Sequence, residues 1–579
     1  MPSTFFGLNT AASALAAAQL QLDIAAHNTA NASTDGYSRQ RVTLVASEPY
    51  TYPAFNRSGL PGQIGTGVSV ATISRVRDAF LDSQLRTQTA LQGAATSRSD
   101  FLSQLESVFP EPAGSGLGSV ISDFWNAWQD VAADPTSTAA RAALVEQVGT
   151  LASRFNRDAT QLSSVIDSVD NLVSQDVGTV NQLATQIAGL NAQIQRVSIS
   201  GDHPNDLQDQ RDLLLDQLAK LTSFSLEPQS DGTVRVLLGG TDLVSGDQAR
   251  AISTGTDANG HLVPTWSWGS NVTLGSGELS SIVDLRDNQL EGYRTQLDQL
   301  AKGIADAVNA IHVTGVDENG NAGLPVFTYA AGREASTLAV NALISADPRR
   351  IAAAFGASSP GDGSVAGRIA DLRDATSVPL GTAGSNLVVG ANLTTNGTAA
   401  VSGVTAPRAK AQGYMLTGTG ASLTLTGADG STETVNVTDI AGNGTGTIAF
   451  DKLGIRIELR AGAAGKLATD IVTDLTTAPN SSIQIGSIFS VAQTAADFYA
   501  GFIGNLGSDS RQASEMATNQ GLVVTHLEQR RESTSGVSLD EEATDMLRFQ
   551  HAYQAAARVI TTMDEMLDTL INRVGIFGR

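Results

Sequence analysis

Hydrophobic residues recur every seven positions near the C-terminal end of the chain. Glu542 interrupts one of the two series, but no Pro or Gly breaks the run from 537 to 574. Acids fill its first turn and Arg573 lies in its last, as the helix dipole favours. The pattern predicts an amphipathic helix with a narrow coiled-coil seam. The seam residues are Leu539, Met546, Tyr553, Ile560, Leu567 and Val574, with Phe549, Ala556, Met563 and Leu570 three positions later.

The N-terminal end carries a matching seam of smaller side chains. Its members are Leu8, Leu15 and Leu22, with Ala11, Ala18 and Ala25 three positions later. Small side chains at one end complement large ones at the other, which favours close pairing of the two ends as a coiled coil. Two ordinary bundle helices are the alternative interpretation.

An energy estimate separates this terminal pair from a helix that is stable alone. Burying about ten side chains contributes roughly 2 kcal/mol each. Ordering ~36 residues costs roughly 1 to 2 kcal/mol each before hydrogen bonds are credited. An isolated terminal helix should therefore fray in water. We state the hypothesis that both ends become ordered only when they pack on neighbouring subunits.

The interior of the chain alternates between helical and strand periodicity. A four-three apolar seam from Leu162 to Val197, broken only by Asp176, predicts a long rod, and a similar seam runs from Leu290 to Ile311. Gly201 and Pro204 separate the rod from the next helix. Residues 224–283 change to a period of two with turns at Gly232 and Gly260, which predicts a small β module.

The region from 313 to 485 is rich in Gly, Thr, Ser and Ala and contains alternating strands. A hairpin is expected from Leu423 to Val437, turning at Asp429-Gly430, and a short helical stretch near 347–374. We therefore predict an α+β multidomain fold with terminal helices pairing as a coiled coil, a long antiparallel helical trunk and inserted antiparallel β domains. The expected parts are 1–38 with 536–579 (terminal domain), 39–223 with 284–312 and 486–535 (trunk), 224–283 (β module) and 313–485 (outer β-rich region).

Composition excludes several classes of partner. The formal net charge is −22 over 579 residues, so a nucleic acid or an anionic membrane surface is not expected to bind. There is no cysteine, which removes disulfides and thiolate metal sites. No apolar run reaches the ~18 residues of a spanning helix. The first basic residue is Arg39, so a cleaved signal peptide is not expected either.

No pattern of a catalytic, metal or cofactor site stands out. The six histidines lie far apart and are interpreted as polar surface. The stretch Asp317-Glu-Asn319-Gly-Asn321 begins like a calcium loop, but Thr328 occupies the twelfth position where Glu is needed, so a simple turn is favoured. The glycines near Gly442 lack a following Lys-Ser/Thr and do not form a phosphate loop. We expect no enzyme, no cofactor and no metal.

Two terminal motifs resemble a known family. The first combines Gly7-Leu8, Asn28, Asn31 and Gly36-Tyr37-Ser38-Arg39-Gln40, and it looks like the N-terminal signature of bacterial flagellar axial proteins. His27, Thr29 and Asp35 depart from the usual pattern but keep its turn chemistry.

The C-terminal motif is more specific. The stretches from Ser535 to Glu542, from Leu547 to Gln550 and from Tyr553 to Ala555 look like the flagellar hook-associated protein 1 (FlgK) family of hook–filament junction proteins. The segments 207–213 and 317–323 are also similar to that family, whereas 380–485 match nothing specific.

The resemblance implies a structural role outside the cell. Members of this family leave through the flagellar type III apparatus without a cleaved signal and assemble as a short tube between the hook and a second junction protein. It also implies that a cytoplasmic export chaperone covers the C-terminal helix before secretion. Subunit and chaperone contacts are therefore expected at Leu539, Met546, Phe549, Tyr553, Ile560, Met563, Leu567, Leu570 and Val574, and the N-terminal motif at Leu8, Leu15, Leu22, Asn28, Asn31, Gly36 and Tyr37.

Three alternatives remain at this point. Another flagellar axial protein, such as a hook or second junction protein, would share the N-terminal motif but not the C-terminal one. A surface adhesin would explain the β region but not the two terminal seams. A secreted wall-cutting hydrolase would need an active site within 313–485.

Overall fold

The computed structural model describes most of the chain. The described residues are 5–49, 64–111, 116–355, 361–375, 377–379, 392–393, 399–405, 410, 412–442, 444–461, 465–477, 482–487 and 493–569. Contacts group the chain into two compact units. Unit 1 comprises Met1–Ser99, Val169–Asp284 and Ala513–Arg579, and unit 2 comprises Asp100–Ser168 and Leu285–Gln512. The four-part division expected from the sequence stays a prediction.

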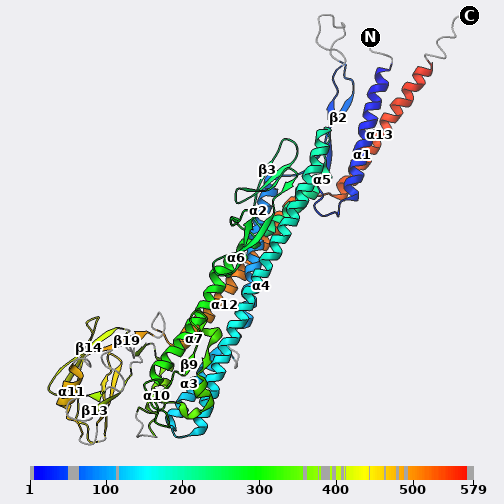
Figure 1. The fold of residues 1–579 in the computed structure, drawn as a ribbon. Coiled ribbons are helices and arrows are strands. Elements are labelled where there is room, and N and C mark those ends of the chain that lie inside the picture. The colour runs from blue at the N-terminus through cyan, green and yellow to red at the C-terminus, as the bar shows by residue number, and fades with distance from the viewer. Residues whose placement is uncertain are drawn as a thin grey trace, which may run out of the picture. The chain divides into compact units, whose positions relative to one another are not determined.

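Long helices dominate both units (Figure 1). Helices α2 (Ala79–Val108), α4 (Thr138–Ile199) and α12 (Ala495–Ser535) each contribute residues to both units. The other helices of unit 1 are α1 (Phe6–Ala30), α5 (Asn205–Leu221), α6 (Glu278–Asp284) and α13 (Leu539–Asp568). The predicted rod, the helix after Pro204 and the C-terminal helix are therefore confirmed.

The strands of unit 1 form antiparallel sheets. Strands β1 (Gln40–Ala46) and β2 (Val68–Arg75) form a hairpin. The β module consists of a four-stranded sheet in the order β3-β4-β5-β6 and the pair β7-β8. Gly232 and Gly260 have positive φ angles of 82° and 88° in its turns, as the sequence predicts. The module strands are β3 (Ser225–Pro228), β4 (Val234–Leu238), β5 (Thr241–Ser245), β6 (Gln248–Ala249), β7 (Ile252–Thr256) and β8 (Leu262–Trp266).

Unit 2 has a helical part built on α3 (Leu117–Ala133) and α7 (Glu291–His312), with a π-helical turn at Leu285–Leu290. Helix α10 (Ser364–Ala370) packs against both α3 and α7. Aromatic rings join the elements, because Phe109 and Tyr293 both meet the ring of Phe502 edge-on. Smaller elements are β9 (Phe327–Thr328), α8 (Glu334–Thr337), β10 (Ala339–Val340), α9 (Ala342–Ala346) and the 3-10 turns Pro348–Arg350 and Asp371–Asp374.

Two further antiparallel sheets of unit 2 enclose a separate core. Their strand orders are β11-β19-β14-β15-β16 and β12-β13-β18-β17, and α11 (Ala468–Thr476) packs against the first. Leu425, Phe450 and Ile471 are fully buried in this core. The predicted hairpin is β15–β16. The strands are β11 (Ser377–Pro379), β12 (Asn392–Leu393), β13 (Ala399–Thr405), β14 (Gly413–Thr419), β15 (Ser422–Gly427), β16 (Thr432–Asn436), β17 (Thr445–Phe450), β18 (Ile455–Ala461) and β19 (Ser482–Ser487).

Several details differ from the sequence-based expectations. The module strands end before Glu278, where α6 begins, and the trunk helix α12 starts at Ala495 rather than near 486. Two histidines are wrongly predicted as polar surface, because His261 and His312 are buried. In a neutral His312 ring, Nδ1 donates to the Leu324 carbonyl at 2.5 Å and Nε2 accepts from the Ala352 amide at 2.7 Å. The His312 ring, at the last position of α7, is therefore part of the buried core of unit 2.

The turn predicted at Asp317 is confirmed. Its Oδ1 accepts from the amides of Asn319 and Asn321 at 2.9 and 2.7 Å, and Arg350 approaches its Oδ2 at 3.3 Å. The carboxylate therefore stabilises the loop itself. Among the described residues, no group of His, Cys, Asp and Glu side chains has an arrangement that could hold a metal ion.

Candidate assembly interface

The two terminal helices lie side by side in unit 1. Helix α1 packs along α13 through its small residues, with Ala11, Ala18 and Ala25 buried (Figure 1). Gly7 lies so close to the side chain of Met563 that a Cβ atom there would overlap its terminal methyl group. Small residues on one helix therefore let the two backbones approach, as in the predicted seam.

The large side chains of this seam are covered only in part. The predicted residues Met546, Phe549, Tyr553, Ile560, Met563 and Leu567 are all half-buried, as are Leu8, Leu15 and Leu22 of α1. Leu539 is 56% exposed, and Leu570 and Val574 lie outside the described residues. The structure therefore places the described members of the predicted set on one helix pair, which buries them incompletely.

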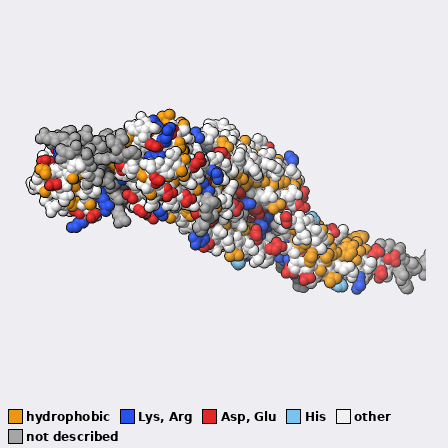
Figure 2. Space-filling view, turned by 90° about the horizontal axis from the view of Figure 1, so that it is seen from below, with side chains coloured by type: hydrophobic (Ala, Val, Ile, Leu, Met, Phe, Trp, Pro, Cys, Tyr) orange, Lys and Arg blue, Asp and Glu red, His pale blue; other side chains and the backbone are white. Residues whose placement is uncertain are grey.

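Further apolar side chains of α13 face solvent outside the seam. Leu547, Val559 and Met566 are exposed. Figure 2 shows hydrophobic side chains gathered on the terminal helices beside the part drawn in grey. Exposed apolar patches on a soluble chain mark contact surfaces. A single chain thus leaves this end incompletely covered.

Asn28 holds the turn that follows α1. This side chain is only 2% exposed and makes four hydrogen bonds. Its Oδ1 accepts from the Gln40 amide at 2.9 Å and from the Tyr37 hydroxyl at 2.8 Å. Its Nδ2 donates to the Gln40 carbonyl at 3.0 Å and to Glu542 Oε2 at 3.2 Å. The amide of Asn supplies both the acceptor and the donors, which explains the residue type at this motif position.

Glu542 connects the C-terminal helix to the same turn. It is buried, and its Oε1 accepts from Arg39 Nε at 2.6 Å. Arg39 also pairs with Glu541 at 2.7 Å, lies 3.6 Å from Asp545, and donates its backbone amide to the Ser535 carbonyl. The residue that interrupts the apolar series therefore ties α13 to residues 28–40, which we call the polar turn.

The polar turn is also bound to helix α5. The amide and hydroxyl of Ser38 donate to Asp209 at 3.0 and 2.8 Å, and Gln40 Nε2 donates to Asp206 at 2.7 Å. Burial raises the pKa of Tyr37, and the charges of Asp206, Asp209 and Glu542 raise it further. Tyr37 therefore keeps its proton and donates to Asn28 throughout the neutral range.

Gly36 gives the turn its shape. Its φ angle is +78°, in the left-handed region that favours glycine. A Cβ atom at this position would lie 3.1 Å from Cβ of Leu213 on α5. Both the backbone conformation and the close approach thus require glycine. Asn31 completes the turn by donating from Nδ2 to the His27 carbonyl at 3.1 Å.

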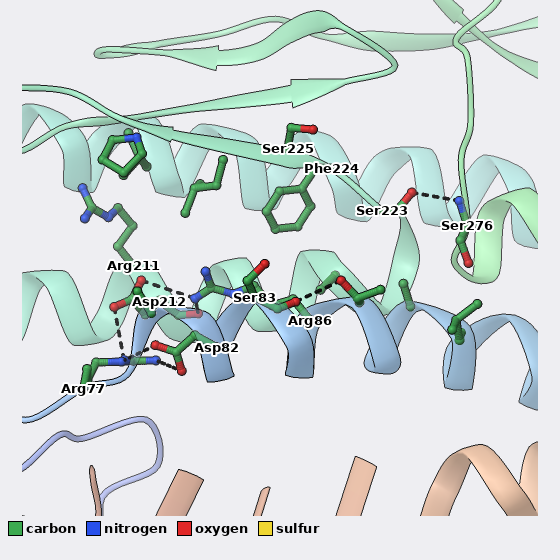
Figure 3. A pocket seen from close by; sticks show the side chains of 18 of the residues that line it. Arg77, Asp82, Ser83, Arg86, Arg211, Asp212, Ser223, Phe224, Ser225 and Ser276 are labelled. Carbon is green, nitrogen blue, oxygen red and sulfur yellow. Dashed lines mark hydrogen bonds and ion pairs between the residues drawn. The ribbon is translucent and has the colours of Figure 1, made fainter. Parts of the chain in front are cut away.

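A network of ion pairs continues from α5 to α2, as Figure 3 shows, and on to α12. Asp212 pairs with Arg75, Arg77 and Arg86, at 2.7, 3.1 and 3.4 Å. Burial opposes ionisation, but Arg77, Arg75 and Arg86 outweigh it and lower the pKa of Asp212. Asp216 links Arg86 to Arg531 of α12, both within 2.7 Å. The network borders a cavity of about 690 Å³ between α2, α5 and β3.

The sequence did not indicate the ionic part of this site. Arg39, Glu542, Asp206, Asp209 and Asp212 were not predicted to lie together, since Arg39 and Glu542 are 503 positions apart. One available signal was the single acid in an otherwise apolar seam. The other was the acidic run on α5, which the resemblance had already marked as a family feature.

The helix pair and its turn are features of a flagellar axial structural protein, and comparisons with known proteins agree with that class. The sequence profiles of "Flagella basal body rod protein" and "Flagellar basal body rod FlgEFG protein C-terminal" match residues 8–37 and 528–573. The profile of "Flagellar hook-associated protein FlgK helical domain" matches residues 102–327. These matches cover both terminal motifs and much of the trunk.

Full-length relatives identify the family. Flagellar hook-associated protein 1 of Bacillus subtilis is 30% identical over 611 residues, covering 100% of both chains. The Escherichia coli protein of the same name is 29% identical over 98% of this chain and 99% of its own. The chain belongs to the flagellar hook-associated protein 1 family and is a structural component of the bacterial flagellum.

A solved structure shares the fold. The flagellar hook junction protein FlgK from Burkholderia pseudomallei superposes with a TM-score of 0.50 at 20% identity, covering 78% of this chain and 100% of that one. The predicted α+β multidomain fold and the family resemblance are thus confirmed. Among the described residues, no helix is long and apolar enough to cross a membrane.

Proposed function

We propose that this chain is the adaptor that joins hook to filament, and that copies assemble through α1 and α13 into a short tube. The half-buried seam of the terminal pair carries the proposal. The name of the Burkholderia structure, a hook junction protein, supports the position in the flagellum. On this proposal the partners are further copies, the hook protein and a second hook-associated junction protein.

The energetics of the terminal pair support assembly between copies. Only Ala556 and Glu542 of α13 are buried among the residues that the structure describes, so most of its seam gains burial only from another molecule. A half-exposed large side chain that becomes covered contributes on the order of 1 kcal/mol. Several such side chains would offset the cost of ordering the helices. We therefore expect that α1 and α13 become fully ordered only when they pack on neighbouring subunits.

The polar turn gives this assembly a defined direction. Hydrogen bonds from Asn28 and Arg39 to Glu542 fix α1 and α13 to each other, and those from Ser38 and Gln40 fix the turn to α5. Buried polar contacts of this kind specify one arrangement over others. A neighbouring copy would thus meet a preformed pair of helices.

A charged substitution in the seam tests the assembly. The double variant Phe549→Asp with Ile560→Asp places two carboxylates on the half-buried face, where contact with another copy would desolvate them. We expect hook–filament junctions to be lost and motility with them, while unit 2 keeps its thermal transition. Intact junctions in cells producing only this variant would refute the role of the seam.

The matched control moves each charge by one residue. Gln550 and Thr561 are exposed on α13. The double variant Gln550→Asp with Thr561→Asp therefore adds the same charge to the same helix, and it should assemble. If both double variants fail alike, charge on α13 in general, rather than the seam, controls assembly.

We propose further that the chain leaves the cell by the flagellar export apparatus and that a cytoplasmic chaperone covers the α13 seam until then. The half-exposed side chains of Phe549, Tyr553 and Ile560 support this, because free subunits with such a face tend to associate. Co-purification of the chaperone with the unaltered chain but not with the Phe549→Asp, Ile560→Asp variant is expected. Equal retention on both would contradict the shared use of this face.

A further inference from the structure

The cavity between α2, α5 and β3 has a largely apolar wall. Its volume of about 690 Å³ is within the range of pockets that hold small molecules. Leu91 of α2, Ala219 of α5 and Leu226 of β3 all border it. Phe224, directly before β3, adds an aromatic ring to the same wall. The cavity can therefore cover the apolar body of a small organic molecule.

Most charged side chains in this wall are paired with one another. Arg75, Arg77 and Arg86 all lie within ion-pair distance of Asp212. Arg77 also pairs with Asp82, the other acid that borders the cavity, at 2.9 Å. These side chains thus satisfy one another.

Arg211 differs from the other arginines of the wall. It is 5% exposed, borders the cavity and forms no ion pair with the described residues. Both of its hydrogen bonds come from Nη1, which donates to Asn191 Oδ1 at 3.0 Å and to the Gly232 carbonyl at 2.9 Å. Its Nε is buried and has no hydrogen-bond partner among the described residues. Figure 3 shows Arg211 extending from α5 toward the strands of the β module, whereas Asp212 faces the arginines beside α2.

The buried guanidinium is charged at neutral pH. Burial lowers the pKa of Arg211 to about 10, the charge of Asp212 raises it, and Arg75 and Arg86 lower it again. A buried cation without an ion-pair partner is costly. An anion that reaches Arg211 from the cavity would therefore be bound favourably.

We propose that this cavity binds a small organic carboxylate, with the carboxylate on Arg211 and an apolar ring or chain against Phe224 and Leu226. A guanidinium holds a carboxylate through two parallel hydrogen bonds. Nη1 already donates within the chain, so Nε and Nη2 supply these bonds. The ligand contacts α2, α5 and β3 together and so holds the β module against the helices of unit 1.

The charge and shape of the wall select this chemical class. Asp82 and Asp212 also border the cavity, and their carboxylates would repel a doubly charged group such as phosphate. The single guanidinium of Arg211 matches a single negative charge. A bare inorganic anion would gain nothing from burial against Phe224 and Leu226, whereas an apolar body would.

Ligand-observed NMR titration of the full chain tests the site with phenylacetate, its uncharged analogue phenylacetamide, and acetate. Phenylacetate should bind saturably and roughly tenfold or more tighter than phenylacetamide, because hydrogen bonds between charged groups are the stronger ones. It should exceed acetate by a similar factor, because acetate lacks the ring. No saturable binding, or equal affinity of phenylacetate with either analogue, would overturn the proposal.

A matched pair of variants identifies the cation. Arg211→Gln should remove the advantage of phenylacetate over phenylacetamide. Arg235→Gln removes the same charge from β4, at a residue that pairs with Glu227 and Asp242 instead. This variant should bind both probes as the unaltered chain does. Equal losses in the two variants would assign the effect to the general charge of the β module and refute the site.

A second variant tests the cavity with Arg211 in place, since Arg211 also holds the Gly232 turn. Leu226→Trp fills the cavity from β3 and should abolish binding of phenylacetate. Unchanged binding in Leu226→Trp would place the ligand elsewhere and overturn the proposal.

Hydrogen exchange of the unaltered chain locates the ligand without any substitution. Saturating phenylacetate should slow exchange in peptides that cover residues 223–228, because the ligand holds β3 against the helices. The α10 peptide of unit 2 should be unchanged. Slower exchange in unit 2 alone, or none at residues 223–228, would refute the site.

Discussion

Helix α4 and the terminal helices carry apolar seams of similar spacing that are buried to different extents. In α4 the side chains of Leu162, Val173 and Ile187 are fully buried. In α13 the equivalent positions, including Phe549 and Ile560, are only half-buried. An apolar seam that is buried within one chain stabilises the fold, whereas an apolar seam that is only half-buried is available for contacts with other molecules.

The largest expected difference between the two seams concerns folding. Val173→Asp would bury an unpaired charge in α4 and should reduce the free energy of unfolding by about 4 kcal/mol. Ile560→Asp should change it little, because solvent reaches this position. Chemical denaturation of both variants checks this, with Ser174→Asp on the exposed face of α4 as control. Equal losses of unfolding free energy in Val173→Asp and Ile560→Asp would contradict the distinction between the buried α4 seam and the half-buried α13 seam.

A second prediction concerns the stability of unit 2 at low pH. Burial lowers the pKa of His312 to about 4, so the unfolded chain takes up this proton at a higher pH than the folded chain. The stability of unit 2 should therefore fall as pH decreases from about 6.5 to 4, by up to roughly 3 kcal/mol. Urea unfolding across this range should show the loss. His526 is exposed, so His526→Gln should leave the curve unchanged, whereas His312→Gln should flatten it.

A smaller effect is expected at the base of the terminal pair. Glu542→Ala would remove the buried carboxylate that accepts from Arg39 Nε and from Asn28 Nδ2, and it should weaken the attachment of α13 by about 2 kcal/mol. Hydrogen exchange of α13 peptides in the free chain measures this. Glu541→Ala removes an exposed partner of the same arginine and should cost less than about 0.5 kcal/mol. If α13 peptides show the same hydrogen-exchange rates in both variants, the burial of Glu542 does not stabilise the attachment of α13.

Sequence periodicity was enough to locate the long helices. The seam from Leu162 to Val197 predicted α4, and Gly201 and Pro204 marked the start of α5, because these signals are local. The half-buried seam residues of α13 were also predicted, since heptad spacing alone places them on one face.

The ionic contacts could not be predicted in the same way. In the sequence Glu542 is only an interruption of the α13 seam, and Asp176 is one of the α4 seam. In the structure Glu542 pairs with Arg39, and Asp176 has a buried oxygen with no hydrogen-bond partner among the described residues. The spacing of residues along the chain does not reveal which charges meet across it. His312 was missed for the same reason, because its partners at Leu324 and Ala352 come from a loop and a separate segment.

Immunogold electron microscopy of intact flagella tests the central claim most directly, using antibody raised against the β-rich region 313–485. The adaptor role predicts label confined to a short band where the hook meets the filament. Label along the filament or the hook would contradict that position and indicate another axial role, and label over the cell body would indicate a surface protein instead.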